Sequence, residues 1–534
     1  MRRSSCPEAP IHRSREAATA RNPSTRQEAF VNCSDFTLYD MIAENAARHP
    51  DRDAVVCGER RMTFGTYRKR CDRYAAGLVR EGLSRGERIA AIGGSGDDCL
   101  VLLGAAAKIG AIVVPVNWRL TGDEIAYVLR DTEPSLLFAG GEHRDSAGKA
   151  SEKIRSIRKR YLFGTDGGEG GFLPFETLRR EDGRETAGAA PGHSPFLIIH
   201  TAATGGRPRG SVLTQANLVA AGLQIAQRLK LDGRDAHICV LPLFHIGGLS
   251  MTFATLLHGG KAVIVDRFDP RTVLQLIERE RGTFLVAFPP ILASILDIQE
   301  KESFDTASLR IAGGMDRPET IERFLKKNPQ ASFYSLYGQT EAMPVSGGDH
   351  AERPGSVGPP AVLTRVALFD DLDREVPPGA TGEICVRSPA VFQGYWNLAG
   401  DTEDTLRNGW HHTGDLGRRD AEGFLWYAGR KPEKELIKSG GENVYPAEVE
   451  RVILGHGSVE DVCVVGVSDP DWGEAVQAVC VLKQGHAVRA EELAEFVAAR
   501  IARYKKPRHV VFVDSLPRTA SGAVDREAVR KIHA

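Results

Sequence analysis

The chain has 534 residues, a formal net charge of −1 at pH 7 and 42% hydrophobic residues. It is too long for one ordinary domain, so two or more are expected. A net charge near zero argues against nucleic acid or an anionic membrane as a partner. No window approaches about 18 consecutive apolar residues, which argues against a membrane span. The nine cysteines form no Cys-x-x-Cys pair and are predicted to be free thiols in the reducing cytoplasm.

Residues 1–34 contain many Arg and Ser residues and no long apolar run. We predict a disordered tail there, with a transit peptide as the alternative. From residue 36 onward, short apolar strands alternate with helices, which is typical of a parallel sheet covered on both faces. The first predicted elements, in chain order, are a helix at 36–49, a strand at 54–56, a helix at 63–82, a strand at 88–92, a helix at 99–109 and a strand at 111–116.

The middle of the chain is predicted to continue this alternation after an interruption. Residues 164–195 are rich in Gly and charged residues and are predicted to form a surface loop. Residues 356–395 favour a β-rich subdomain, and a compact α+β unit is expected from about residue 434. The later predicted strands are 237–241, 261–265, 462–467, 475–482 and 510–513, and the later helices are 251–257, 271–279, 490–502 and 526–533.

The stretch 196–210 is the strongest local signal. An apolar run at 196–199 is followed by two hydroxyl side chains, two glycines and an arginine, which are Thr201, Thr204, Gly205, Gly206 and Arg209. Backbone N–H groups, hydroxyls and fixed positive charge together suit phosphate oxygens. A Gly-rich surface turn is the alternative, and a Walker P-loop is excluded because its Gly-x4-Gly-Lys-Ser/Thr spacing is missing. A strand at 211–213 and a helix capped by Thr214 are predicted to follow.

The stretch 336–341, Leu-Tyr-Gly-Gln-Thr-Glu, is a second candidate site. Tyr337 could stack on a planar base, Thr340 could bind a phosphate oxygen and Glu341 could hold Mg²⁺. A Tyr-Gly turn before a helix is the alternative. Farther upstream, Gly313-Gly314-Met315 follows a predicted strand at 309–312, and on its own it indicates only a turn at the end of a strand.

The stretch 409–417, Gly-Trp-His-His-Thr-Gly-Asp-Leu-Gly, is the densest signal, and it is followed by Gly429-Arg430 and by Ser-Gly-Gly-Glu-Asn-Val-Tyr-Pro at 439–446. An Asp after Gly is most often a turn residue, and a Gly-Gly pair is typical of a tight hairpin. In this order, the signals together resemble the motifs of the AMP-forming adenylating superfamily, which holds acyl-CoA synthetases of the 4-coumarate–CoA ligase type, luciferases and peptide-synthetase adenylation domains.

The resemblance runs from about residue 36 to residue 531. The Tyr-Gly-x-Thr-Glu motif of the superfamily matches in full at 337–341. The phosphate loop, Tyr-Thr-Ser-Gly-Thr-Thr-Gly-x-Pro-Lys-Gly, matches with substitutions: Ala202 and Ala203 stand for Ser-Gly, Gly205 stands for Thr and Arg209 stands for Lys. The hinge segment at 429–435 is two residues longer than in the superfamily, and we place its pivot at Lys434.

The resemblance implies an α/β fold in two domains. A large N-terminal domain at 35–430 would contain layered, mostly parallel sheets with helices and a β-rich subdomain. A hinge at 431–435 would lead to a small, mobile α+β domain at 436–534. The implied nucleotide-binding residues are Thr201, Thr204, Gly205, Gly206, Gly313, Gly314, Met315, Tyr337, Gly338, Thr340, Asp415 and Arg430. Asp415 would accept the ribose hydroxyls.

The resemblance also implies a reaction. A small carboxylic acid would attack the α-phosphate of ATP, with Mg²⁺ at Glu341, and the small domain would then turn so that coenzyme A takes the acyl group. The implied catalytic positions are Arg209, His245, Thr340, Glu341, Lys434 and position 523. The implied acyl pocket contains Phe244, His245, Gly247 and Phe288, and the coenzyme A tunnel contains Gly440 and Gly441.

Several alternatives stay open at this point. An amide ligase would use an amino acid amine as the acceptor, and a catalytically weakened protein would bind the acyl-adenylate without turnover. The basic cluster Arg503, Lys505, Lys506 and Arg508 could contact coenzyme A phosphates or form a solvated face. No charged anchor is evident in the expected pocket walls, which favours an apolar, aromatic or cyclic acid. Either a monomer or a homodimer is expected.

The main departure from the superfamily lies near the C-terminus. Residues 517–526 resemble its Pro-x-Thr-x-Ser-Gly-Lys-x-x-Arg motif, but Ala523 occupies the Lys position. That Lys would bridge the carboxylate and the α-phosphate. Arg209 could take over part of this role, although a planar guanidinium does not replace an ammonium ion directly. Alternatively, adenylation is weak by nature in this chain, or Ala523 is an engineered substitution.

Restoring the Lys should therefore accelerate acyl-adenylate formation. Loss of one preorganised donor to transition-state charge costs about 10²–10³ in rate, so we expect Ala523→Lys to raise acyl-AMP formation at least about tenfold. Acid-dependent pyrophosphate release from the two proteins measures this, and an unchanged rate would contradict the assigned role of position 523.

Overall fold

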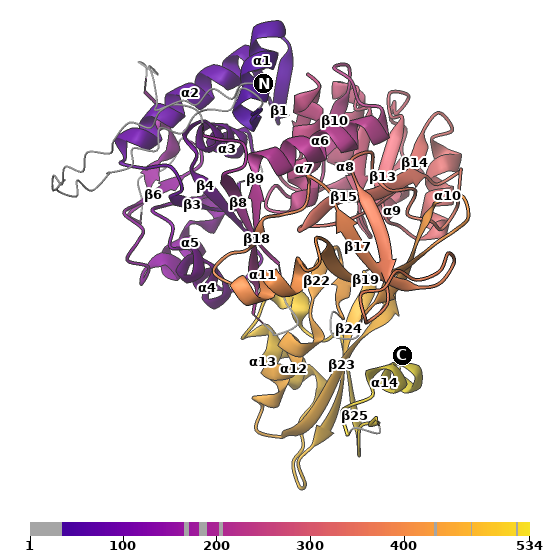
Figure 1. Cartoon of the computed structure of the whole chain (residues 1–534). Helices are drawn as coiled ribbons and strands as arrows, with labels where there is room; N and C mark the ends of the chain where they lie inside the picture. Colours follow the sequence, from indigo (N-terminus) through magenta and orange to yellow (C-terminus); the bar gives the residue numbers. More distant parts are fainter. Residues whose placement is uncertain are drawn as a thin grey trace, which may run out of the picture.

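The computed structural model describes residues 35–94, 96–164, 170–180, 190–201, 207–431, 435–470, 472–519 and 522–533. Figure 1 shows a large upper body of sheets and helices and a smaller body below it that carries the C-terminus. The predicted tail at 1–34, the phosphate-loop residues Thr204, Gly205 and Gly206, and the predicted pivot Lys434 lie outside the described residues.

One eight-stranded sheet forms the N-terminal side of the large body, in the order β18-β9-β8-β4-β3-β5-β6-β7. Pairing is parallel from β8 to β7, while β9 and β18 are antiparallel additions. Its strands are β3 (Arg88–Ile92), β4 (Ile112–Val116), β5 (Leu136–Ala139), β6 (Lys159–Leu162), β7 (Leu173–Pro174), β8 (Pro195–Thr201), β9 (Arg209–Thr214) and β18 (Gly394–Tyr395). The helices of this region are α2 (Phe64–Arg80), α3 (Asp97–Ile109), α4 (Gly122–Thr132) and α5 (Arg144–Ser151).

A second eight-stranded sheet has the order β15-β14-β13-β12-β10-β11-β1-β2 and is parallel except at its two edges. Its strands are β1 (Asp53–Cys57), β2 (Arg60–Thr63), β10 (Ala236–Cys239), β11 (Lys261–Ile264), β12 (Phe284–Ala287), β13 (Ile311–Gly314), β14 (Ser332–Gln339) and β15 (Ala342–Asp349). The accompanying helices are α1 (Leu38–Arg48), α6 (Gln215–Leu229), α7 (Ile246–Leu257), α8 (Pro270–Glu280), α9 (Ile291–Gln299) and α10 (Pro318–Lys327).

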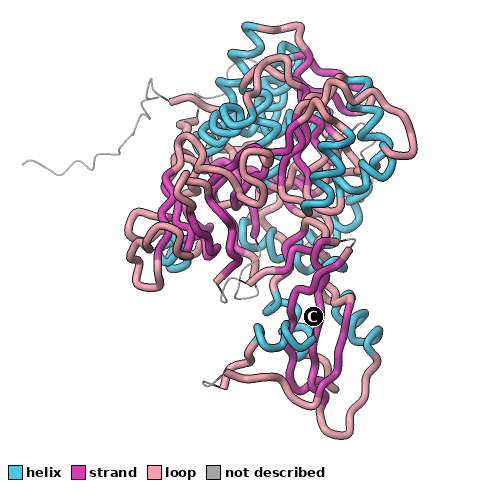
Figure 2. Tube along the Cα trace, turned by 90° about the vertical axis from the view of Figure 1, so that its right-hand side faces the viewer, coloured by secondary structure: helices cyan, strands magenta, loops and turns pink. Residues whose placement is uncertain are grey.

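Two smaller sheets complete the fold. The β-rich subdomain contains β16 (Arg365–Phe369), β17 (Gly382–Arg387), β19 (His411–Arg419), β20 (Leu425–Arg430) and the helix α11 (Ala399–Thr405). The small body contains β21 (Ile437–Ser439), β22 (Glu442–Val444), β23 (Val459–Asp469), β24 (Gly473–Leu482), β25 (His509–Val513), α12 (Pro446–Leu454), α13 (Ala490–Ala498) and α14 (Arg526–His533). In Figure 2 the long strands of this body extend below the large one. The predicted α/β fold class is confirmed, while the domain boundaries stay a prediction.

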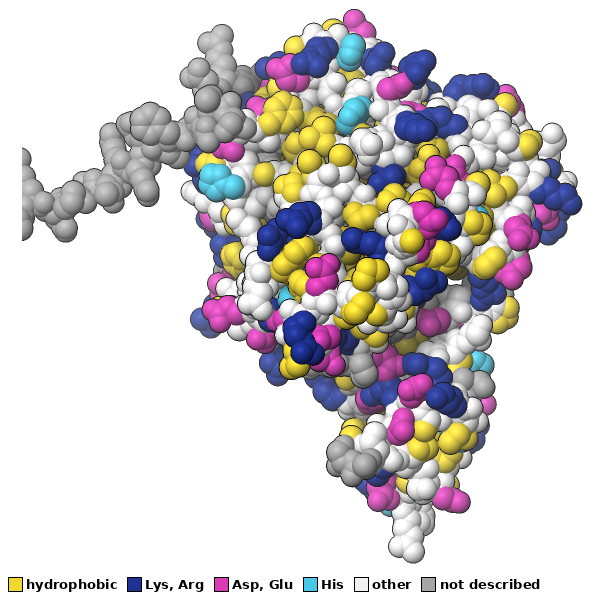
Figure 3. All heavy atoms as spheres, turned by 45° about the vertical axis from the view of Figure 1, so that its right-hand side comes forward, with side chains coloured by type: hydrophobic (Ala, Val, Ile, Leu, Met, Phe, Trp, Pro, Cys, Tyr) yellow, Lys and Arg dark blue, Asp and Glu magenta, His cyan; other side chains and the backbone are white. Residues whose placement is uncertain are grey.

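Local sequence explains the elements that position the crevice described below. Thr214 is the N-cap of α6: its hydroxyl accepts from the Asn217 N–H at 3.0 Å, and Asn217 reaches back in a capping box. Helix α3 is apolar on nearly all faces, and it is correspondingly buried between other elements. Seven cysteines in the described part of the chain are buried free thiols, as predicted. Figure 3 shows both signs of charge interspersed on the face it presents.

The prediction of a surface loop at 164–195 is wrong for part of that segment. Residues 173–178 form β7 and a short 3-10 helix, and Phe172, Phe175 and Leu178 are almost fully buried. The Phe175 ring stacks on Tyr74 of α2 with centroids 4.2 Å apart. The Gly-rich, charged composition of the segment did not indicate burial, because its three buried apolar side chains are not consecutive in the sequence. The helix predicted from residue 251 also begins earlier, at Ile246.

Phe175 should therefore contribute to stability as a core residue. We expect Phe175→Ala to lower the free energy of unfolding by about 3–5 kcal/mol, because it leaves a cavity beside Tyr74. Leu173→Ala is the matched control on the same segment; its side chain is 41% exposed, and a change within about 0.5 kcal/mol is expected. Urea unfolding measures both. Equal losses for the two variants would contradict the packing described.

Candidate functional site

A crevice of about 1680 Å³ lies where the two bodies meet. It is lined by the end of β14 and the turn that follows it (338–341), by the end of β20, and by the β21–β22 hairpin of the small body. The predicted site residues along this crevice are Thr201, Arg209, His245, Gly247, Phe288, Met315, Tyr337, Gly338, Thr340, Glu341, Arg430, Gly440 and Gly441. Segments more than 200 residues apart in the chain thus share one hollow.

Glu341 is the centre of a hydrogen-bonded group on the crevice floor. Its Oε1 accepts hydrogen bonds from the hydroxyls of Thr201 at 3.2 Å, Ser211 at 3.1 Å and Tyr395 at 3.1 Å. Glu341 lies in the β14–β15 turn, and its three donors lie on β8, β9 and β18 of the other large sheet. Glu341 is only 8% exposed, and these three hydroxyls satisfy its buried carboxylate oxygen.

Arg209 adjoins this group. Its guanidinium lies over the Tyr395 ring, 4.1 Å from the centroid, and Nη1 donates to Asp401 at 2.9 Å. Burial by itself lowers the pKa of Arg209, but Tyr395, Asp401 and Glu341 more than offset this and raise it. Arg209 therefore presents a permanent positive charge along the crevice wall, beside the Glu341 carboxylate.

Asp415 lies behind the crevice wall and is 1% exposed. Its Oδ2 accepts from the Tyr337 hydroxyl at 2.7 Å and from Gln339 Nε2 at 2.6 Å, while Arg430 Nε lies 3.1 Å from Oδ1. Burial and the Asp415 charge raise the pKa of Tyr337 well above its usual value. Gln339 was missed by sequence reasoning, because the superfamily motif leaves its position unspecified.

The glycines at the end of β13 have a steric role. Gly314 has φ = 127°, and a Cβ there would lie 2.0 Å from the Ala287 carbonyl oxygen on β12. Only glycine fits this close approach of two parallel strands. Met315, the next residue, lines the crevice, whereas Gly313 and Gly314 lie in the strand behind it.

Three of the four residues predicted for the acyl pocket line the crevice, and their role stays a prediction. His245, Gly247 and Phe288 line the crevice, but Phe244 does not. The Phe244 side chain is 7% exposed and packs beside the His245 ring, with centroids 4.4 Å apart. The expectation that no charged anchor lies in the walls is wrong, because Arg228 of α6 lines the crevice. Nothing local distinguishes it from an exposed helical arginine.

The β21–β22 hairpin faces the large body across the crevice. Gly440 and Gly441 have φ values of 58° and 83° and form the tight turn. The next residue, Glu442, accepts from Arg119 Nη1 at 2.7 Å and from Asn117 Nδ2 at 3.2 Å, so it ties the two bodies together. Burial raises the pKa of Glu442, but His245 and Arg119 outweigh this and lower it.

Lys505 makes a second contact between the bodies and differs from both predictions for the basic cluster, whereas Arg503 and Arg508 are exposed. Lys505 is 2% exposed, and its Nζ lies 2.6 Å from Glu124 of the large body and 2.8 Å from Glu448 of the small one. A buried, doubly paired ammonium belongs neither to a solvated face nor to a site for free phosphates. Lys506, by contrast, pairs with the half-exposed Glu495.

Ala523 is not brought to the crevice. It is exposed, and its carbonyl accepts from the Thr519 N–H at 2.8 Å in a turn. Arg526 and Arg530 of α14 line the crevice in its place. The small body therefore turns its glycine hairpin toward the site together with Arg526, the last residue of the C-terminal motif, whereas Ala523 does not line the crevice.

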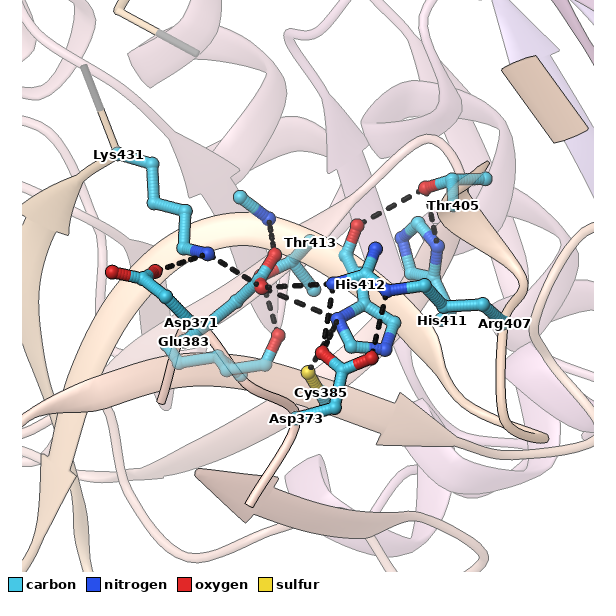
Figure 4. Close-up of polar contacts among 12 residues, drawn as sticks. Asp371, Asp373, Glu383, Cys385, Thr405, Arg407, His411, His412, Thr413 and Lys431 are labelled. Carbon is cyan, nitrogen blue, oxygen red and sulfur yellow. Dashed lines mark hydrogen bonds and ion pairs between the residues drawn. The ribbon is translucent and has the colours of Figure 1, made fainter. Parts of the chain in front are cut away.

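A polar network lies on strands β17 and β19 of the β-rich subdomain (Figure 4). Glu383, Cys385 and His412 each offer one ligand atom within 4.8 Å of the others, the arrangement of a potential metal site. Lys431 Nζ and His412 Nδ1, however, lie 3.1 and 3.2 Å from Glu383 Oε2. Burial raises the pKa of Glu383, but His412 and the Lys431 ammonium outweigh burial and lower this pKa to about 2. The network is thus an ion-pair cluster that holds Lys431, the first residue of the predicted hinge.

A large α/β body and a small α+β body around such a crevice define the two-domain fold of adenylating enzymes, which solved structures share. Residues 42–396 match the model of the AMP-binding enzyme family, and residues 448–523 match the model of its C-terminal domain. The chain belongs to the AMP-binding enzyme family.

Individual relatives are similar over almost the whole chain. An indoleacetate–CoA ligase from Aromatoleum aromaticum is 34% identical over 504 residues, which cover 93% of this chain and 98% of that protein. A feruloyl-CoA synthase from Amycolatopsis is also 34% identical, and the match covers 91% of this chain and 97% of that protein. The solved structure of the amide bond synthetase McbA from Marinactinospora thermotolerans is similar with a TM-score of 0.83 and 26% identity, over 93% of this chain and 100% of that one.

Lys505 gives a prediction about the junction between the bodies. We expect Lys505→Met to lower the free energy of unfolding by about 3–5 kcal/mol, because it leaves the Glu124 and Glu448 carboxylates buried without their cation. Lys506→Met is the matched control and should cost at most about 1 kcal/mol, since its ion pair is exposed. Urea unfolding compares the two. A smaller loss for Lys505→Met than for Lys506→Met would refute the buried pairing.

Proposed function

We propose that the crevice activates a small carboxylic acid with ATP as an acyl-adenylate and then passes the acyl group to coenzyme A. The chain is an AMP-forming acid–thiol ligase of the AMP-binding family. The family matches and the CoA ligase relatives support this enzyme class. The observation that supports the site is the convergence of Glu341, Arg430 and the Gly440 hairpin on one hollow.

The nucleotide would lie along the β14–β15 turn. Thr201, Thr340 and Arg209 border the crevice where hydroxyls and a fixed cation suit phosphate oxygens. Asp415 and Arg430 would serve the ribose, with Asp415 exchanging one of its present donors for a ribose hydroxyl. Met315 and Tyr337 would flank the base. Thr204, Gly205 and Gly206 belong to the same proposal by their position in the sequence alone.

Glu341 is the proposed magnesium ligand. Mg²⁺ prefers carboxylate oxygens together with phosphate oxygens and water, and Glu341 borders the crevice while its carboxylate accepts hydrogen bonds from three hydroxyls. This donor set fits the ion. When bound there, Mg²⁺ would neutralise charge on the phosphates, while Thr201, Ser211 and Tyr395 hold the carboxylate in position.

In the observed arrangement, the small body would serve the second step, which is transfer of the acyl group to coenzyme A. Its Gly440–Gly441 turn borders the crevice without side chains, which leaves room for a thiol to approach the acyl carbon. For the first step, the small body would turn about Lys434 and bring position 523 toward the carboxylate. That motion requires Glu442 and Lys505 to release Arg119 and Glu124, their partners on the large body.

An amide ligase is the second candidate function. The similarity to the amide bond synthetase McbA, with a TM-score of 0.83 over 93% of this chain, favours keeping it. The mass of the product formed with coenzyme A, compared with that formed with amino acid amines, separates the two acceptors. A cytoplasmic location and a monomeric or homodimeric state are further proposals. No helix in the described ranges combines the length and apolarity that crossing a bilayer requires.

Glu341 offers the direct test of the first step. We expect Glu341→Gln to lower acid-dependent pyrophosphate release by about 10²-fold, because the amide removes the negative charge that would hold Mg²⁺ but keeps an oxygen acceptor for the three hydroxyls. Glu375→Gln, an exposed carboxylate of the same chain, is the control and should leave the rate unchanged. Wild-type activity in Glu341→Gln would remove Glu341 from the mechanism.

A further inference from the structure

One side of the crevice is an apolar chamber formed by α6, α7 and strands β12, β14 and β15. Its apolar lining residues are Ile225, Leu229, Met251, Val286, Leu336 and Met343. Arg228, near the C-terminal end of α6, lines the same chamber. A guanidinium among these side chains is exceptional, since an apolar wall offers no oxygen atoms to its five N–H donors.

The partners of Arg228 leave most of its hydrogen-bonding capacity unused. Its Nη2 donates to the Pro360 carbonyl at 2.9 Å, and its Nε is buried without a partner. Within the described residues no carboxylate lies at ion-pair distance from it, whereas Arg119, Arg209 and Arg430 of the same crevice each pair with one. Burial lowers the pKa of Arg228, and Tyr334 and Glu352 offset this only in part.

The hydroxyl beside Gly347 on this wall is already engaged. The Ser346 hydroxyl, which also lines the crevice, donates to the Val357 carbonyl at 2.8 Å. Gly347 keeps the wall beside Arg228 open: a Cβ there would lie 2.8 Å from Leu336 Cδ2 and 3.5 Å from Arg228 Cγ. An uncharged, wholly apolar acyl group would leave the guanidinium desolvated without compensation.

We propose that Arg228 binds a second carboxylate, at the end of the acyl group remote from the carboxyl group that is activated. The substrate class is then an acid with an apolar or aromatic body and an anionic distal end. This inference rests on the proposed function, and it refines it by naming the substrate class. A charge-assisted, bidentate contact supplies both affinity and orientation.

Matched acids test this contact. The probes are 3-phenylpropanoic acid, its para-carboxy derivative and its para-hydroxy derivative, each with ATP and Mg²⁺. The proteins are the wild type, Arg228→Leu, Arg228→Lys and, as control, Arg234→Leu, whose arginine is exposed and pairs with Asp232. Pyrophosphate release gives kcat and KM for each acid, and Tm shifts with acid and ATP report binding where turnover is slow.

The wild type should prefer the dicarboxylic acid. Because hydrogen bonds to charged groups are strong, Arg228→Leu should lower the ratio of kcat/KM for the dicarboxylic acid to that for the monocarboxylic acid by about 10–100-fold. The loss should appear mainly in KM for the acid. Arg228→Lys should retain part of the preference, and Arg234→Leu should keep the wild-type ratio.

Three results would overturn the assignment: no wild-type preference for the dicarboxylic acid in rate or Tm shift, an unchanged ratio in Arg228→Leu, or a preference for the hydroxy acid instead. Failure of the proposed function looks different. In that case no carboxylic acid of a broad panel releases pyrophosphate, either with the wild type or with Ala523→Lys, whereas a failure confined to Arg228 leaves that release intact.

Discussion

The Glu341 carboxylate is the constraint on which the crevice depends. It belongs to the β14–β15 turn of one large sheet, and its hydroxyl donors Thr201, Ser211 and Tyr395 belong to the other. A buried carboxylate is tolerated only where donors satisfy it. These three hydrogen bonds therefore join the two large sheets at the floor of the crevice.

The small body is held against this hollow by charges, not by an apolar interface alone. Glu442 pairs with Arg119, and Lys505 pairs with both Glu124 and Glu448. Breaking a buried ion pair is costly, because one charge is then left buried and uncompensated. In the proposed turn about the 431–435 segment these ion pairs would have to break, and other partners would have to replace them in the second position.

The sequence predicted the alternating strands and helices of the large body well, because apolar periodicity and caps such as Thr214 are local features. It also predicted the residues that gather along the crevice, through the motif at 337–341 and the Gly440 turn. It failed at Phe175, whose burial depends on a distant helix, and at Phe244, which packs away from the crevice. It misjudged Lys505, because the residue type alone does not show whether a lysine ammonium is buried or solvated.

By itself, then, the sequence determined which chemical groups are present and which strand ends and turns carry them, since hydroxyls, glycines and carboxylates at such positions follow from local spacing. The tertiary structure alone decided which groups share a space. It set Arg228 in an apolar chamber without a carboxylate partner among the described residues, joined Gln339 to Asp415, and left Ala523 in an exposed turn. The physical reason is that burial and pairing depend on contacts between residues that are distant in the sequence, which no local pattern encodes.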